Sequence, residues 1–153
     1  MSGPGSDARP GDGVGLVVEV GGWSMLREAV SPLRVAVFVD EQGFPIDEEF
    51  DAADAGALHA LARLDGEAVG TGRLLPDGRI GRMAVLARAR GLGVGGAILM
   101  RLVALARSRG DAAVELSAQL HALPFYASHG FEAHGPVYDD TGAPHRAMRL
   151  RLV

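Results

Sequence analysis

The stretch GRIGRMAVLARARGLGVGG, Gly78–Gly96, decides the fold and carries the clearest functional signal of the chain. An apolar run, Ile80–Leu86, ends in a basic, glycine-rich loop, Arg88–Gly96, which opens into the apolar-periodic segment AILMRLVALARSRG. A strand that feeds a glycine-rich helix N-terminus predicts an anion site, because the first helical N–H groups have no intrahelical partner and the helix dipole favours negative charge. Glycine lets a phosphate approach the backbone, and Arg90 adds a cation beside it. We therefore expect a ligand that bears a phosphate or pyrophosphate.

Two known motifs fit these letters. Gly91–Gly96, read GLGVGG, satisfies the dinucleotide fingerprint GxGxxG, and Glu115 lies roughly 20 residues further on, where that fingerprint expects an acidic residue. Arg90–Gly95, read RGLGVG, also satisfies [RQ]xxGx[GA], the pyrophosphate loop of acetyl-coenzyme A-dependent acyltransferases. Position favours the second motif, because about 90 residues precede it and fewer than 40 follow Glu115, too few for the second half of a dinucleotide fold.

Length and composition indicate one globular domain. The chain has 153 residues, of which 48% are hydrophobic and 22% charged, and this suits a single domain with its own core. Residues 1–13 are polar and lack the apolar region of a signal peptide, so we expect a disordered tail there and the domain over residues 14–153. Cysteine is absent and no apolar run reaches about 18 residues, which excludes disulfides and thiolate metal sites and favours a cytoplasmic location.

Charge is divided between two segments. Asp40–Asp54 is strongly acidic, whereas Arg73–Arg109 is strongly basic. An acidic and a basic patch on one protein suit a cationic acceptor and an anionic cofactor, although each single charge also fits an ordinary solvated surface. The net charge of −4 gives no reason to expect nucleic-acid binding.

Apolar periodicity and turn residues predict a mixed α+β fold. Strands are expected at residues 14–20, 58–64, 67–75, 80–86, 113–118, 131–135 and 145–152. Helices are expected at residues 24–39 with a break at Pro32, at 94–109 and at 122–129. Asp65-Gly66 is a hairpin turn signal, and Gly110 ends the helix that follows the glycine loop. This order gives an antiparallel meander before the glycine loop and one βαβ crossover at it.

Further motifs extend over nearly the whole chain. Phe125–Phe131 has the form FYxxxGF, Val37–Gln42 reads VFVDEQ, Glu49–His59 fits ExDxxDxxxxH, and Gly142–Met148 fits GxPHxxM. Together with the glycine loop, these motifs make the chain resemble the GNAT superfamily of N-acetyltransferases, in a bacterial branch of small single-domain proteins. The resemblance implies an α+β fold (mixed αβα) with a central, mostly antiparallel twisted sheet of about six to seven strands flanked by about four helices.

Site residues follow from the resemblance by position. The enzyme would transfer an acetyl group from acetyl-CoA, its cosubstrate, to a primary amine by direct attack. Tyr126 would lie near the thioester sulfur as general acid toward the leaving thiolate, and Ser128 replaces the lysine common in this motif. The cofactor-binding residues would be Met83, Ala84 and Val85 at the pantetheine arm, and Arg90, Gly91, Leu92, Gly93, Val94, Gly95 and Gly96 at the pyrophosphate.

Acetyl transfer to an amine requires a base and a hydrogen-bond donor for the oxyanion. An ammonium must lose a proton to a base, directly or through water, and a donor such as the Val85 N–H must stabilise the developing oxyanion. Glu49 and His59 are the candidate catalytic bases, although a histidine on a strand is also a common hydrogen-bonded structural residue. His145 is a further candidate for the lining of the acceptor pocket.

Two rival functions stay open at the level of sequence. One is a CoA-binding sensor or regulatory module without catalysis, and the other is an NAD(P)-dependent oxidoreductase that uses GxGxxG. The acceptor could be a small molecule or a protein lysine, and a homodimer would be common for this family. We expect no membrane partner, and no metal, because His121, His129 and His134 lack the spacing of a zinc motif.

Overall fold

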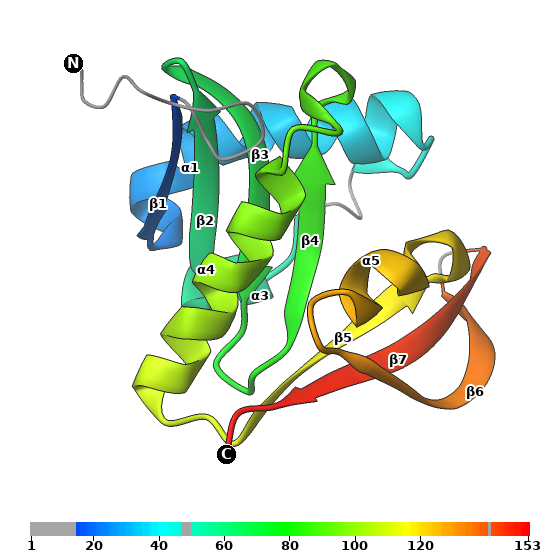
Figure 1. Ribbon diagram of the computed structural model, residues 1–153. Helices are drawn as coiled ribbons and strands as arrows, with labels where there is room; N and C mark the ends of the chain where they lie inside the picture. Colours follow the sequence, from blue (N-terminus) through cyan, green and yellow to red (C-terminus); the bar gives the residue numbers. More distant parts are fainter. Residues whose placement is uncertain (1–14, 47–49, 141) are drawn as a thin grey trace.

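Two antiparallel sheets form the framework of the protein (Figure 1). The structure, a computed structural model, describes residues 15–46, 50–140 and 142–153. The first sheet has the order β1-β2-β3-β4 and contains β1 (Leu16–Gly21), β2 (Leu58–Leu64), β3 (Glu67–Leu74) and β4 (Ile80–Val85). The second has the order β5-β7-β6 and contains β5 (Ala113–Gln119), β6 (Glu132–Asp140) and β7 (Ala143–Arg151). The predicted α+β class with seven mostly antiparallel strands is thereby confirmed.

Helices cover both faces of the first sheet (Figure 1). The long helix is α4 (Val94–Arg109), and on the opposite face α1 (Trp23–Arg34) runs into η1 (Val35–Glu41), a π-helix. The short elements are α3 (Ala53–Gly56), α5 (Leu123–Ala127), and the 3-10 turns η2 (Ala87–Ala89) and η3 (Leu120–Ala122). Within the described ranges, no helix combines the length and the apolar character needed to cross a bilayer.

The expected helix break at Pro32 does not occur at that residue. Helix α1 continues through Pro32 to Arg34, and the hydrogen-bond spacing then widens, so that the Gln42 N–H donates to the Val37 carbonyl at 3.0 Å. Proline removes one helical hydrogen bond, but Val30 on the same helix is fully buried in a small apolar cluster. Packing of this face keeps the helix together, and the π-helix Val35–Glu41 follows it.

The predictions of the Asp65-Gly66 turn and of the ends of the long helix are confirmed. Asp65 and Gly66 have φ angles of 51° and 88°, the left-handed pair that a type I′ turn requires. Helix α4 has the predicted bounds, and Gly110 ends it with a φ of 92°. Strand β6 is longer than predicted, because the chain passes Gly135 and Pro136 through a bulge on an edge strand, where a proline costs no ladder hydrogen bond.

Helix α4 packs tightly onto β3 and fixes the glycine loop in front of it. Its buried face contributes Ile98, Leu99 and Leu102 to the main core, all fully buried. Gly70 and Gly72 on β3 permit this approach, since a Cβ at Gly70 would lie 2.9 Å from Ile98 and one at Gly72 would lie 3.0 Å from it.

The two sheets meet at one point and then diverge. A parallel bridge pairs Arg79 with Glu115, and the Glu115 N–H donates to the Gly78 carbonyl at 3.1 Å. Beyond this bridge β4 and β5 separate (Figure 1). Strand β4 also carries a bulge, marked by the register shift opposite Thr71–Arg73 and by the positive φ of 50° at Arg82. The opening between β4 and β5 positions the candidate site.

Candidate acyl-transfer site

The glycine loop has the backbone geometry that an anion site would require. Gly91 and Gly93 have φ angles of 80° and 82°, so both use the left-handed backbone region that favours glycine. The Ala97 N–H donates to the Gly93 carbonyl at 3.0 Å and closes the first turn of α4. The preceding helical N–H groups, on residues 94–96, have no acceptor within the helix. They supply donors and the positive end of the helix dipole at the mouth of the loop.

A cavity of about 460 Å³ lies against this loop. All of the predicted cofactor-binding residues except Leu92 line it: Met83, Ala84, Val85, Arg90, Gly91, Gly93, Val94, Gly95 and Gly96. A Cβ added at Gly96 would lie 3.1 Å from Nε2 of His129, and one at Gly95 would lie 3.5 Å from the Phe125 ring. Side chains at these two positions would narrow the cradle, so the loop fits a pyrophosphate that contacts the backbone.

The outer edge of β4 presents backbone groups to the opening between the sheets. The Leu86 N–H donates to the Val69 carbonyl at 2.9 Å, toward β3. Because successive residues of a strand direct their backbone groups to opposite edges, the N–H and carbonyl of Val85 point away from β3. The Val85 carbonyl accepts a hydrogen bond from Nε of Arg90 at 3.0 Å. The Val85 N–H is therefore oriented as an oxyanion donor or a partner of an extended ligand would require.

Arg90 is held by an acidic partner that the sequence did not reveal. Its two terminal nitrogens donate to the Glu41 carboxylate at 2.7 and 2.6 Å. The hydrogen bond from Arg90 lowers the pKa of Glu41 below its ordinary value, and the same bond raises the pKa of Arg90. This bidentate pair ties the end of η1 to the glycine loop and fixes the guanidinium, so the loop N–H groups remain the main donors toward an anion.

Tyr126 lies where two cavities meet. It belongs to α5 and packs edge-on against Phe125 and Phe131, with ring centroids 5.0 and 6.0 Å apart. Burial raises the pKa of its phenol to about 12, so the hydroxyl stays protonated at neutral pH. Tyr126 and Met83 line both the cavity at the glycine loop and a second cavity beside it. A proton donor thus faces the junction of two spaces.

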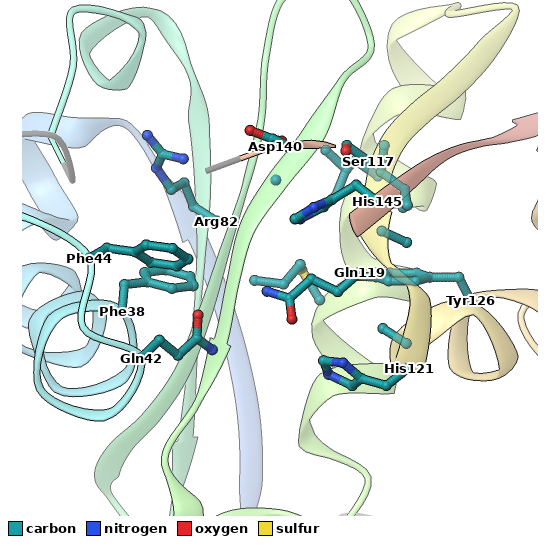
Figure 2. Close-up of a pocket in the computed structure, with 16 residues that line it drawn as sticks. Phe38, Gln42, Phe44, Arg82, Ser117, Gln119, His121, Tyr126, Asp140 and His145 are labelled. Atoms are coloured by element: carbon teal, nitrogen blue, oxygen red, sulfur yellow. The ribbon is translucent and has the colours of Figure 1, made fainter. Parts of the chain in front are cut away.

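The second cavity has a volume of about 380 Å³ and lies between η1, β4 and the tip of the second sheet. Figure 2 shows Phe38, Gln42 and Phe44 on one side and Gln119, His121 and His145 on the other. His145, which we expected to line an acceptor pocket, lines this second cavity. Phe38 and Gln42 belong to the VFVDEQ motif, which could have indicated this wall, whereas Phe44 and Gln119 carry no motif signal.

His59, one of the two candidate bases, lines neither of these cavities. His59 is 1% exposed, its Nε2 bonds to the Asp54 carbonyl at 2.9 Å, and its ring packs on Trp23 with centroids 4.9 Å apart. Burial lowers the pKa of His59. Glu49 lies outside the described residues. The geometry therefore places His59 in a structural setting and not beside Tyr126.

Three of the four described carboxylates of the acidic segment, those of Glu41, Asp51 and Asp54, bind arginines. The buried Asp54 carboxylate accepts from Arg34 at 2.9 Å and from Arg73 at 2.8 Å. Asp51 accepts from Arg73 at 2.9 Å and from Arg82 at 3.3 Å. Burial by itself would raise the pKa of Asp54, but the hydrogen bonds from the two arginines outweigh it and lower that pKa. Much of the acidic patch thus compensates internal cations instead of facing a ligand.

Comparison with known proteins agrees with this geometry. The family model of the GNAT acetyltransferase domain matches residues 27–152. The uncharacterized N-acetyltransferase YjcF of Bacillus subtilis strain 168 is 38% identical over 121 residues, which cover 76% of this chain and 86% of that protein. The crystal structure of an acyl-CoA N-acyltransferase from Pseudomonas aeruginosa superimposes with a TM-score of 0.78 at 33% identity, covering 88% of this chain and 99% of the other.

The structure of Escherichia coli ElaA is similar as well, with a TM-score of 0.79 and 30% identity over 89% of this chain and 99% of that one. The dinucleotide alternative has no comparable support, since Glu115 bonds to Arg149 at 3.1 Å and does not line the cavity at the glycine loop. This chain belongs to the GNAT family of acetyltransferases and is an acyltransferase that uses an acyl-CoA.

Proposed function

We propose that this protein is an acetyl-CoA-dependent N-acetyltransferase that transfers the acetyl group to a primary amine by direct attack. The observation that carries the proposal is the junction at Tyr126, where the cavity at the glycine loop meets the second cavity. A donor and an acceptor held in these two spaces would bring the thioester and the amine together in one complex. No covalent enzyme intermediate is then required.

The donor side would use backbone groups. The N–H groups of the glycine loop and the start of α4 bind the pyrophosphate, and the outer edge of β4 from Met83 to Val85 pairs with the pantetheine arm as a further strand would. This pairing directs the thioester toward Tyr126. The Val85 N–H then donates to the carbonyl oxygen as negative charge develops on it.

Tyr126 assists departure of the thiolate. Its phenol, with a pKa of about 12, remains a hydrogen-bond donor throughout the neutral range. Alkyl thiols titrate near 8.5, well below this phenol, so most of the assistance is a hydrogen bond that stabilises the sulfur as the C–S bond breaks. Proton delivery to sulfur through the same hydroxyl completes the step, and this is the general-acid role.

The acceptor is assigned only as far as a primary amine. A cationic amine was expected from the acidic segment, but Glu41, Asp51 and Asp54 bind arginines. The second cavity instead combines the rings of Phe38 and Phe44, 6.5 Å apart, with polar groups on the opposite wall. An amine with an apolar portion suits this lining.

A two-part experiment tests the proposal. Thermal-shift titrations with acetyl-CoA, CoA, NAD and NADP identify the ligand, and incubation of the protein with acetyl-CoA and an amine panel follows, with product detection by mass spectrometry. Stabilisation by acetyl-CoA and CoA together with an N-acetylated product supports the enzyme. Stabilisation without any product would favour a CoA-binding sensor, and stabilisation by NAD or NADP alone would contradict the proposal.

A further inference from the structure

We propose that His145 is the general base that removes a proton from the acceptor amine, an assignment that rests on the proposed acetyl transfer. His145 lies near the start of β7 and is 7% exposed, yet it lines the second cavity. Figure 2 shows its imidazole directed into that cavity, across from Phe38 and Phe44. A nine-tenths buried imidazole that still reaches the acceptor space is placed to act on a ligand there.

The hydrogen bond at the other ring nitrogen fixes the tautomer of His145. Its Nδ1 lies 2.9 Å from the Ala143 carbonyl oxygen, which can only accept a hydrogen bond. In the neutral ring Nδ1 must therefore carry the proton, and Nε2 is left with a lone pair. Among the residues that the structure describes, no side chain or backbone group hydrogen-bonds to this Nε2. The ring is thus oriented with its basic nitrogen available to a ligand.

Sheet geometry separates this base from the proposed acid. Gln119 and Tyr138 are the cross-strand partners of His145, so all three side chains share one face of the second sheet. Met148, three residues further along β7, belongs to the opposite face and to the core against which Tyr126 packs. His145 and Tyr126 therefore reach the same cavity from opposite faces, around the β5 edge. A base on the acceptor side and an acid on the donor side are what direct attack requires.

Three other groups near His145, the side chains of His121, Tyr138 and Arg82, are less suited to this role. His121 also lines the cavity, but it is exposed, and among the described residues no hydrogen bond orients its ring. The remaining titratable or charged side chains that face His145 from the neighbouring elements are Arg82, Tyr126, Tyr138 and Asp140. Tyr138 is engaged with the Ser117 hydroxyl. Arg82 is a cation, and its partner is Asp51, so it cannot accept the proton.

The reaction removes two protons from the ammonium nitrogen. One N–H proton of the ammonium passes to Nε2 of His145, and the neutral nitrogen attacks the thioester carbonyl carbon. As the C–S bond breaks, Tyr126 gives its hydroxyl proton to the thiolate, and the second proton of the nitrogen passes to the Tyr126 oxygen, directly or through water. The imidazolium then releases its proton to solvent. The products are the amide, the free thiol and one proton in solution.

The test compares His145→Gln with His134→Gln, a matched change at a β6 histidine that lines neither of the two cavities, and with His121→Gln, the rival candidate on the same cavity. For an alkylamine acceptor at pH 7, His145→Gln should lower kcat/KM by about 100-fold or more, with the acetyl-CoA KM and the melting temperature unchanged. The variant can use only the neutral amine, whose fraction rises about tenfold for each pH unit below the pKa of the acceptor. The ratio of wild-type to variant kcat/KM should therefore shrink by about tenfold for each unit by which the pH is raised toward that pKa. A structural defect would lower kcat/KM by a similar factor at every pH and would not make the two profiles approach each other. His134→Gln should keep the wild-type profile.

Two results would overturn the assignment. Parallel pH profiles of His145→Gln and wild type would show that His145 is not the base, and a converging deficit in His121→Gln would transfer the role to that residue. If wild-type protein binds acetyl-CoA but acetylates none of the amines, the proposed function itself fails, and the role of His145 fails with it. The wild-type reaction therefore separates the two failures.

Discussion

Tyr126 is a packing residue for which we also propose a chemical role. Tyr126→Phe keeps the ring contacts with Phe125 and Phe131 and removes only the hydroxyl. We expect kcat to fall by roughly 100-fold, the usual scale of a single general acid, while the acetyl-CoA KM stays near the wild-type value. Steady-state kinetics that follow thiol release measure both constants.

The chain offers a matched control for this change. Tyr138 is its only other tyrosine and lines neither of the two cavities. Tyr138→Phe should retain most of the activity, because its hydroxyl bonds to Ser117 on the exposed sheet face. Full turnover by Tyr126→Phe would remove the acid role from the account.

Asp54 holds together the charged cluster beneath α1. It neutralises Arg34 and Arg73 with side chains that are all at most 9% exposed. Asp54→Asn removes the charge that both guanidinium groups share, and loss of a buried partner of this kind costs roughly 3–5 kcal/mol of unfolding free energy. The exposed pair between Glu19 and Arg63 is the control, because Glu19→Gln should cost about 1 kcal/mol or less. Urea unfolding at pH 7 measures both changes, and equal costs would contradict the cluster's importance.

Acid should weaken the fold through the same cluster. Burial lowers the pKa of His59 from 6.5, so the unfolded chain binds a proton there before the folded chain does. This contribution is present above about pH 6.5 and is lost as pH falls through the lowered folded pKa. The pKa of Asp54 is also lowered, and its contribution disappears only below about pH 3.9. Unfolding free energies from pH 7 to 5 should therefore decline, and His59→Gln should flatten that part of the curve.

At the scale of elements, the glycine loop allows a clean separation of strain from binding. Gly91 and Gly110 both have a positive φ, and a Cβ at either would meet no atom within 4 Å. Substitution by alanine should cost each about 1–2 kcal/mol of stability. Only Gly91→Ala should also raise the Kd for acetyl-CoA, because Gly91 lines the cavity at the glycine loop. Calorimetric titration against both variants measures this, and equal affinities would argue against the loop as the pyrophosphate site.

Periodic elements and their ends were predictable from the sequence, but their tertiary partners were not. Helix α4 and the Asp65-Gly66 turn follow from local residue pattern and backbone preference. The course of α1 through Pro32 depends on burial against the sheet, which local pattern does not contain. Likewise the pairing of Glu41 with Arg90, 49 residues apart, depends on the folded arrangement. The lining residues at the glycine loop were predictable because one continuous motif carries them, whereas His145 and Tyr126 share a cavity only through the topology of the second sheet.

At the scale of the whole molecule, the two sheets diverge, and we expect acetyl-CoA to bind in the opening between β4 and β5. Acetyl-CoA in this opening would hydrogen-bond the Val85 N–H and the N–H groups at the start of α4. At a concentration about 100 times its Kd, these amides should exchange with solvent about 100-fold more slowly. Hydrogen exchange followed by mass spectrometry measures this. Amides of β1 and β2 lie away from the space between β4 and β5, so their exchange through local unfolding should slow much less. Equal slowing of all amides would point to a different site.

The most direct test of the account follows the acetyl group itself. Protein, acetyl-CoA labelled with ¹³C in the acetyl carbonyl, and an amine acceptor identified by the panel would be mixed and quenched over time. We predict that the label appears in an amide carbonyl of the amine, in step with release of the thiol, and that intact-protein mass never shows an acetylated chain. Label that accumulates first on the protein, or that leaves the thioester only as acetate, would contradict direct transfer from acetyl-CoA to the amine.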